Sequence, residues 1–553
     1  MRFNTKKLVA VVFAALLPWC CPKAVACTGL IVGPKASTDG SVIISYSADS
    51  HTLYGELYYW PAATWAAGAM LDVVEWDTGA FSGRIPQIAR TYQVVGNMNE
   101  KQVAITESTF GGRKELHGTE GLIDYGSLIY IALQRSATAR EAIQVMTSLV
   151  DKYGYKSTGE TFSIADKNEV WVMEMVGKGK GEKGAVWVAL RVPDDCVTAH
   201  ANQSRIQTFP LNDPENCLYA KDVITFAKKK GFYKGADKDF SFQKAYAPYD
   251  FSALRACEAR VWSFFNKFAE QDMTSYLPFV MGEKPNDNPM PLFVKPKKKL
   301  SVADVRDMMR DHYEGTPMDM TQDVGAGCYK VPYRWRPMTY EVDGQEYINE
   351  RAIATQQTGF VLVAQLRNYL PDYVGGVLWF GVDDADMAVF TPMYCSISKV
   401  PECYKVGNGD MMNFSWTSAF WIHNWVANMA YNKYSYMIKD IRVRQQALEG
   451  KYMAMQPMIE QYAVQLGKES EEKARAFLTE YACSEANMAT QEWKKLGEYL
   501  LVKYMDGNVK KEEGGKFKDN GHGLSASPQF PGYDAEYYRK IAEETGDKLK
   551  VRN

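Results

Sequence analysis

The sequence lacks the local signatures of several large enzyme classes. It has no Gly-rich phosphate loop, no His-Glu-x-x-His zinc motif and no Gly-x-Ser-x-Gly nucleophile turn. It also has no Cys-x-x-Cys pair and no cysteine–histidine spacing that suits structural zinc. These absences argue against P-loop nucleotide chemistry, that class of zinc protease and that class of serine hydrolase. We therefore predict no metal site and no cofactor.

A strong charge imbalance is also missing. The 553 residues include 64 Lys and Arg against 66 Asp and Glu, which leaves a formal net charge of -2. No basic run alternates with aromatic residues, so no nucleic-acid partner is predicted. Beyond the first residues, no stretch is apolar for about 18 residues, so no membrane span is predicted.

The first 26 residues have the pattern of a secretory leader. A basic start (residues 2–7) precedes an apolar run (8–17), and Ala24-Val25-Ala26 puts small residues where signal peptidase needs them. We predict cleavage after Ala26 and a secreted or periplasmic protein. The alternative is a lipoprotein, because a small residue before Cys27 also ends a lipobox, although Ala24 stands where lipoboxes prefer Leu. Lipid attachment would alkylate the Cys27 thiol.

Cysteine is present but follows no recognisable framework. Two of the ten cysteines lie in the predicted leader, and Cys27 would begin the mature chain. An oxidising compartment permits disulfides, for example between Cys395 and Cys403 across a short loop. The pairing of the cysteines stays open at this stage.

Cleavage after Ala26 would give Cys27 both a thiol and a free α-amine. A thiol with a pKa of about 8.5 is mostly protonated at neutral pH and needs a base. An α-amine with a pKa of about 7.7–8.0 is suited to that task. A nucleophile and its base would then belong to one residue.

Two competing kinds of site are weaker. Six histidines are present, and two of them, His51 and His200, lie close in sequence to Asp49 and Asn202. None of the six lies in the sequence pattern that surrounds the catalytic residues of papain-type proteases. Asp383, Asp384 and Asp386 suggest a cation site, yet we predict a solvated turn between strands there.

The pattern of the chain predicts strands first and helices last. Residues 28–32 and 41–46 form a predicted hairpin through a turn that ends in Asp-Gly. Helices are expected at 125–136, 138–152 and 302–312, with Thr138 and Ser301 as N-caps. Further strands are expected at 102–106, 161–164, 169–175, 185–192, 360–365, 374–382 and 387–390. From residue 414 the pattern is helical, with predicted helices at 416–449, 453–466, 469–481, 487–505 and 535–548.

The opening of the mature chain resembles a known family. Cys27-Thr28-Gly29-Leu30-Ile31-Val32-Gly33, the segment 36–41 and Asp49 resemble the start of the C69 dipeptidases, which are N-terminal nucleophile hydrolases. The segment Arg310 to Asp319 (RDHYEGTPMD) agrees as well. The resemblance implies an α+β fold, a four-layer αββα sandwich over residues 27–413, with a helical C-terminal region of residues 414–553 packed on it.

The same resemblance implies roles for individual residues. Cys27 is the nucleophile, Asp49 holds its α-amine, and Asn99 and Asn202 supply the oxyanion site. Many relatives have Arg-Asn where this chain has Tyr46-Ser47. In place of that family arginine, we expect either Tyr46 or an arginine from elsewhere in the chain, such as Arg205 or Arg351, to stabilise the thiolate and bind the substrate.

We therefore expect a secreted cysteine dipeptidase that works through a thioester and binds small peptides. Two alternatives stay open: an amidase of non-peptide amides such as bile-salt conjugates or N-acyl compounds, and a peptide-binding surface lipoprotein without catalysis. The helical C-terminal region is either a cap over the cleft or a structural buttress. A homo-oligomer is compatible with the sequence.

Overall fold

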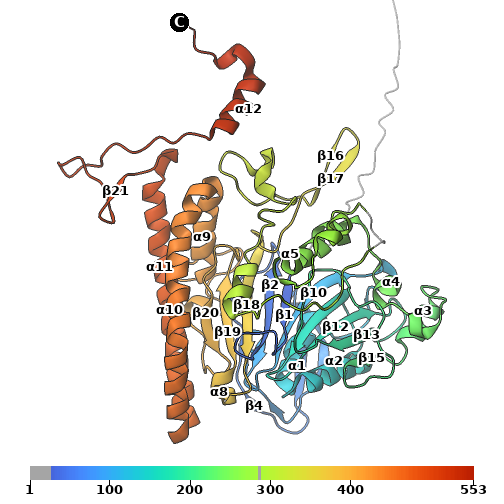
Figure 1. Ribbon diagram of the computed structural model, residues 1–553. Helices are drawn as coiled ribbons and strands as arrows, with labels where there is room; N and C mark the ends of the chain where they lie inside the picture. Colours follow the sequence, from blue (N-terminus) through green and yellow to red (C-terminus); the bar gives the residue numbers. More distant parts are fainter. Residues whose placement is uncertain (1–26, 284–287, 553) are drawn as a thin grey trace, which may run out of the picture.

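The computed structural model describes residues 27–283 and 288–552, and Figure 1 shows them with two large antiparallel sheets. The predicted leader of residues 1–26 therefore lies outside the described residues. Its cleavage stays a prediction.

The first sheet has six strands and contains the start of the described chain. Its order is β14 (Val197–His200), β1 (Gly29–Val32), β2 (Val42–Asp49), β18 (Thr358–Leu366), β19 (Val377–Val382) and β20 (Thr391–Tyr394). Every residue of the central strands β2 and β18 is buried. Both faces of this sheet are therefore covered, which explains why its strands are so apolar.

The second sheet has eight strands and lies against the first. Its order is β15 (Cys217–Tyr219), β13 (Ala185–Arg191), β12 (Val170–Gly177), β11 (Gly159–Ala165), β10 (Ala104–Gly111), β9 (Met98–Asn99), β8 (Val94–Val95) and β3 (Tyr59–Trp60). Strands β10 and β11 contact β2, and β10 also contacts β1. Helices α1 (Tyr125–Arg135) and α2 (Ala139–Tyr153) pack on the β10–β11 region and bury a separate apolar cluster.

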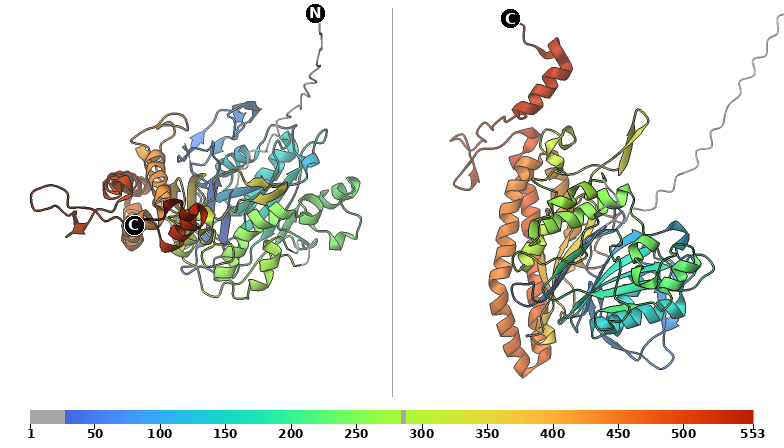
Figure 2. Two further views of the ribbon diagram at one scale, coloured as in Figure 1. Left: turned by 90° about the horizontal axis from the view of Figure 1, so that it is seen from above. Right: turned by 45° about the vertical axis from the view of Figure 1, so that its right-hand side comes forward.

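Several further elements are short; most lie around the sheets, and the pair of strands at residues 512–517 lies beyond the long C-terminal helices (Figure 1 and Figure 2). The helices are α3 (Val223–Lys229), α4 (Phe242–Tyr246), α5 (Ala259–Phe268), α6 (Leu277–Val280), α7 (Val302–Met308) and α8 (Asp372–Gly375). Small two-stranded sheets are formed by β4 (Ala63–Thr64) with β7 (Arg90–Thr91), β5 (Met70–Val74) with β6 (Phe81–Pro86), β16 (Thr339–Val342) with β17 (Gln345–Ile348), and β21 (Glu512–Glu513) with β22 (Lys516–Phe517). Helix α5 contacts β14, and α7 contacts β2 and β18.

The two predicted helix caps are confirmed. Thr138 accepts a hydrogen bond from the Glu141 amide, and Ser301 forms a reciprocal capping box with Asp304. Helix α7 ends at Met308, earlier than expected. The amides of Arg310 and Asp311 then bond to carbonyls three residues back in tighter turns, and the Asp311 carboxylate accepts hydrogen bonds from Ser263 and from the amide of Tyr313.

The predicted strand at 387–390 and the solvated turn before it are wrong. The amides of Met387 and Ala388 donate to the carbonyl of Asp384, which makes a turn, and the strand β20 begins only at Thr391. Asp383, Asp384 and Asp386 are all buried, where Asn424, Tyr431 and Arg442 respectively bind their carboxylates. The carboxylates face packed helices, and sequence spacing alone cannot show this.

The C-terminal region is helical as expected, but its helices begin and end elsewhere. The helix expected at 416–449 is interrupted at Lys433, whereas the breaks expected at 450–452 and 482–486 are absent. Helices α9 (Ala419–Asn432), α10 (Tyr434–Glu469), α11 (Glu471–Lys503) and α12 (Ala535–Thr545) follow each other in the chain. Gly450 and Pro457 lie inside α10. Packing of α10 along α11, and of α11 on β20, outweighs the local preference of these residues to end a helix.

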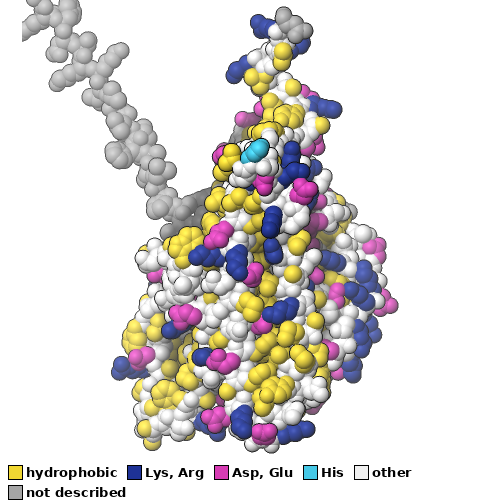
Figure 3. Space-filling view, turned by 90° about the vertical axis from the view of Figure 1, so that its left-hand side faces the viewer, with side chains coloured by type: hydrophobic (Ala, Val, Ile, Leu, Met, Phe, Trp, Pro, Cys, Tyr) yellow, Lys and Arg dark blue, Asp and Glu magenta, His cyan; other side chains and the backbone are white. Residues whose placement is uncertain are grey.

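The long helices expose a mixed surface. The face in Figure 3 carries basic and acidic side chains scattered among apolar ones, and Val443, Met458 and Tyr462 of α10 are among the exposed apolar residues. Within the described residues, no helix is both long enough and apolar enough to cross a membrane.

The eight described cysteines are all free thiols. The disulfide suggested between Cys395 and Cys403 is therefore not formed. Both side chains are buried, and Cys395 contacts the carbonyl of Asp372 through its thiol.

Candidate active site

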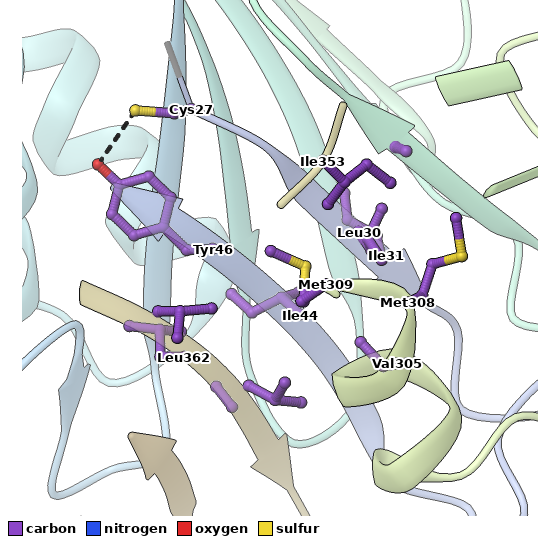
Figure 4. Close-up of a cluster of buried hydrophobic side chains, with 14 of the residues drawn as sticks. Cys27, Leu30, Ile31, Ile44, Tyr46, Val305, Met308, Met309, Ile353 and Leu362 are labelled. Carbon is purple, nitrogen blue, oxygen red and sulfur yellow. Dashed lines mark hydrogen bonds between the residues drawn. The ribbon is translucent and has the colours of Figure 1, made fainter. Parts of the chain in front are cut away.

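Cys27 lies two residues before the first residue of β1 and is completely buried. The neighbouring residue Thr28 pairs with Ser47 of β2 through two backbone hydrogen bonds. This pairing brings the thiol beside Tyr46, as Figure 4 shows, above an apolar cluster that includes Leu30 and Ile44. The predicted hairpin thus fixes the thiol in space.

The Cys27 thiol faces a hydroxyl and a carboxyl group. Its sulfur lies 3.7 Å from the Tyr46 hydroxyl and 3.4 Å from Oε1 of Glu107. The Tyr46 hydroxyl donates to the same Glu107 oxygen at 2.5 Å. Tyr46 comes from β2 and Glu107 from β10, so the two sheets meet at the thiol.

Burial sets the protonation of this group. It raises the pKa of Glu107 to about 7. Burial raises the pKa of the Cys27 thiol well above its usual value, and the negative charges of Glu107 and Asp49 add smaller increases. The thiol is therefore protonated in this environment and needs a base before it can act as a nucleophile.

Asp49 ends β2 beside the thiol and is completely buried. Its carboxylate accepts hydrogen bonds from Ser47 at 2.9 Å and from Thr358 at 2.7 Å, and it forms an ion pair with Arg351. The backbone amide of Asp49 also donates a hydrogen bond to the Cys27 thiol, which offsets a small part of the increase in the pKa of the thiol. The structure thus places Tyr46 and Asp49 next to Cys27, with Arg351 bound to Asp49, and the roles expected for these residues stay predictions.

Sequence reasoning missed Arg260 on α5. Its guanidinium is buried and donates to the Cys27 carbonyl at 2.7 Å and to the Thr28 hydroxyl at 2.8 Å. It also donates to the Ala201 carbonyl at 3.0 Å and to Oδ1 of Asn202 at 2.8 Å. The sequence feature that could have indicated this residue is its position as the only charged residue in the mostly apolar stretch 259–265. A charged side chain in such a stretch needs buried partners.

Asn202 is connected to Cys27 through Arg260. It follows β14 with a left-handed φ of 61°. Its Nδ2 donates to the Thr109 carbonyl at 2.7 Å, while its Oδ1 accepts from Arg260. This asparagine therefore joins the start of β1 to the end of β10.

Asn99 and Arg205 belong elsewhere in the fold. Asn99 donates to the carbonyls of Leu133 and Ser136, both at 2.7 Å, and its Oδ1 accepts from two backbone amides. Both hydrogens of the amide nitrogen and the amide oxygen are therefore already used and cannot bind a ligand. Arg205 forms a buried ion pair with Glu258 at 3.0 Å and donates to two carbonyls. The expected oxyanion role of Asn99 and the site role of Arg205 are therefore not supported by these contacts.

His200 does not form a catalytic pair with Cys27. Its ring lies between the hydroxyls of Ser108 at 2.6 Å and Ser163 at 2.7 Å. Burial, with Arg205 and Arg260 nearby, lowers the pKa of His200 to about 3, so the ring is neutral. No cluster of three or more potential metal ligands occurs within residues 27–283 and 288–552.

A cavity of about 520 Å³ opens on the thiol. Cys27, Tyr46, Asp49 and Asn97 are among its lining residues, whereas Asn99 and Arg205 are not. Its aromatic wall consists of Tyr54, Tyr58, Trp60, Trp76, Tyr125, Tyr130 and Phe360. None of the described lining residues comes from α9–α12, but Phe420 and Trp421 of α9 pack against Tyr54 of this wall from behind.

Glu107→Gln is expected to weaken the pH dependence of stability. Because the folded-state pKa of about 7 exceeds the usual 4.5, ionisation of Glu107 destabilises the fold as pH rises through that interval. Glu107 alone therefore makes the free energy of unfolding higher at about pH 5 than at about pH 8, and this contribution to the difference should be lost in the variant.

Urea unfolding at the two pH values measures this difference. Glu341→Gln, an exposed carboxyl on β16, is the control and should keep the wild-type difference. An undiminished difference in Glu107→Gln would contradict the assignment.

Comparison with known proteins identifies the family of this chain. The model of peptidase family C69 matches residues 26–60 and 54–447. A probable dipeptidase of Latilactobacillus sakei is 27% identical over 431 residues, which cover 74% of this chain and 82% of the relative. A probable dipeptidase of Salmonella dublin is 26% identical over 398 residues (67% and 81%), and dipeptidase A of Lactobacillus helveticus is 22% identical over 436 residues (74% and 83%). The chain therefore belongs to peptidase family C69.

Proposed function

We propose that the protein is a secreted cysteine dipeptidase of the N-terminal nucleophile type. The observation that carries this proposal is the buried Cys27 thiol, which lines a cavity and lies two residues before the start of β1. The names of the relatives support dipeptides as substrates. The stacked sheets, with α1 and α2 on one side and α9 and α11 on the other, are compatible with the proposed αββα sandwich.

The proposed reaction begins when cleavage after Ala26 frees the α-amine of Cys27. This amine accepts the thiol proton while the sulfur attacks the carbonyl carbon of the peptide bond. The C–N bond then breaks, the amine product leaves with the proton, and the acyl group stays on sulfur as a thioester. Water hydrolyses the thioester and restores the thiol.

The surrounding residues have proposed supporting roles. Asp49, held by Arg351, binds the α-ammonium that forms in the first step. Arg260 positions Cys27 through its carbonyl, and Asn202 holds Arg260. Asn97, which lines the cavity, is proposed as an oxyanion donor in place of Asn99.

Mass spectrometry of the mature N-terminus, together with a substrate panel, tests the proposal. The secreted protein should begin with an unmodified Cys27 and should hydrolyse unblocked dipeptides. A lipid on Cys27, or a start at another residue, would overturn the mechanism. Activity on N-acyl amides without activity on dipeptides would instead identify a non-peptide amidase.

A further inference from the structure

The charged residues that line the cavity all carry the same sign. Among the described lining residues these are Asp49, Glu56, Asp72, Glu75 and Asp77, and no lysine, arginine or histidine is present with them. A cavity with this lining attracts positive groups and repels negative ones.

Three of these carboxylates already have cationic partners. Asp49 pairs with Arg351, Asp72 with Arg84 at 2.6 Å, and Glu75 with Lys156 at 4.0 Å. Each of these three charges therefore has a counter-charge at ion-pair distance within the protein.

Glu56 and Asp77 differ from the other three. In the described part of the chain, neither has a lysine, arginine or histidine within 4.0 Å. Glu56 accepts hydrogen bonds from the Gly407 amide and the Tyr58 hydroxyl, and Asp77 accepts one from the Tyr125 hydroxyl at 2.8 Å. These neutral donors leave the two negative charges without a counter-charge.

Packed aromatic rings occupy the same wall as these two carboxylates. Tyr58 and Trp76 have ring centroids 4.8 Å apart, and Tyr130 lies 4.6 Å from Trp76 and 4.4 Å from Trp60. The Tyr58 hydroxyl donates a hydrogen bond to the Glu56 carboxylate, and Trp76 directly precedes Asp77 in the chain. Aromatic faces and carboxylates together are the groups that bind ammonium and guanidinium ions in proteins.

We infer that this cavity selects dipeptides with a lysine or arginine side chain, and that Glu56 and Asp77 bind the positive charge. The inference rests on the proposed function, because the same cavity contains Cys27. Every free dipeptide has one ammonium and one carboxylate at its termini. A basic side chain adds a positive charge that matches the two uncompensated carboxylates.

Steady-state kinetics on four dipeptides tests the inference. Lysyl-alanine or alanyl-lysine should exceed leucyl-alanine in kcat/KM by about tenfold or more, and glutamyl-alanine should be the poorest substrate. The position of the preferred lysine identifies which residue of the substrate reaches the carboxylates. Equal values for the lysine, leucine and glutamate substrates would overturn the inference.

Charge-neutral variants connect the preference to the two residues. Glu56→Gln and Asp77→Asn should each lower the kcat/KM ratio of the better lysine substrate to leucyl-alanine by about three- to tenfold. Glu341→Gln removes one negative charge outside the cavity and should leave the ratio unchanged. An unchanged ratio in both cavity variants would contradict the assignment.

Binding to the inactive Cys27→Ala protein separates this inference from the proposed function. Calorimetry should give a lower Kd for the preferred lysine dipeptide than for leucyl-alanine. If wild type hydrolyses dipeptides without regard to charge, only the inference fails. If wild type hydrolyses no dipeptide but Cys27→Ala still binds the lysine dipeptide more tightly, only the proposed function fails.

Discussion

Cys27→Ala should lower kcat/KM for an unblocked dipeptide by more than about 10⁴-fold, because the variant has no atom that can form the thioester. The side chain is buried and lies beside the cavity, so a methyl group fits the space that the thiol leaves. The folded protein should therefore persist while hydrolysis is lost. Release of the free amino acids, followed by chromatography, measures this loss.

The matched control is Cys196→Ala, which removes a buried thiol outside the cavity lining. Its kcat/KM should stay near the wild-type value. Mass spectrometry after treatment with iodoacetamide should find that alkylation of Cys27 accompanies inactivation of the wild type. Substantial turnover by Cys27→Ala would reject Cys27 as the nucleophile.

Arg260→Ala should reduce the free energy of unfolding by about 3–5 kcal/mol and should also abolish most activity. The guanidinium donates to the carbonyls of Cys27 and Ala201, to the Thr28 hydroxyl and to Asn202. Truncation leaves these buried acceptors without their donor and leaves a cavity. The start of β1 should then lose its fixed position, so kcat should fall together with stability.

Urea unfolding and kinetics on the same preparations measure the two effects. Arg444→Ala, an exposed arginine on α10, should change the free energy of unfolding by less than about 0.5 kcal/mol. Arg260→Lys keeps one charge but cannot reproduce the forked hydrogen bonds, so it should be intermediate. Wild-type stability in Arg260→Ala would contradict the role given to this residue.

Local features of this protein could be predicted from its sequence. The hairpin of residues 28–46, the caps at Thr138 and Ser301 and the apolar strands β12 and β18 all appear in the structure. Such features depend on neighbouring residues, because caps need specific side chains at short spacing and strands need runs of suitable residues. The opening motif that contains Cys27 also indicated the family, and the family match agrees.

The contacts of the site depended on tertiary structure. Glu107 is 80 residues from Cys27, and Arg260 is 233 residues away, yet both contact Cys27. Asn99 appeared suitable in sequence, but the fold uses its amide to hold four backbone groups. Sequence patterns determined which segments form strands and helices and where the cysteine stands. Only the stacking of the two sheets and the position of α5 decided which side chains surround the thiol, because those contacts join residues that no local pattern relates.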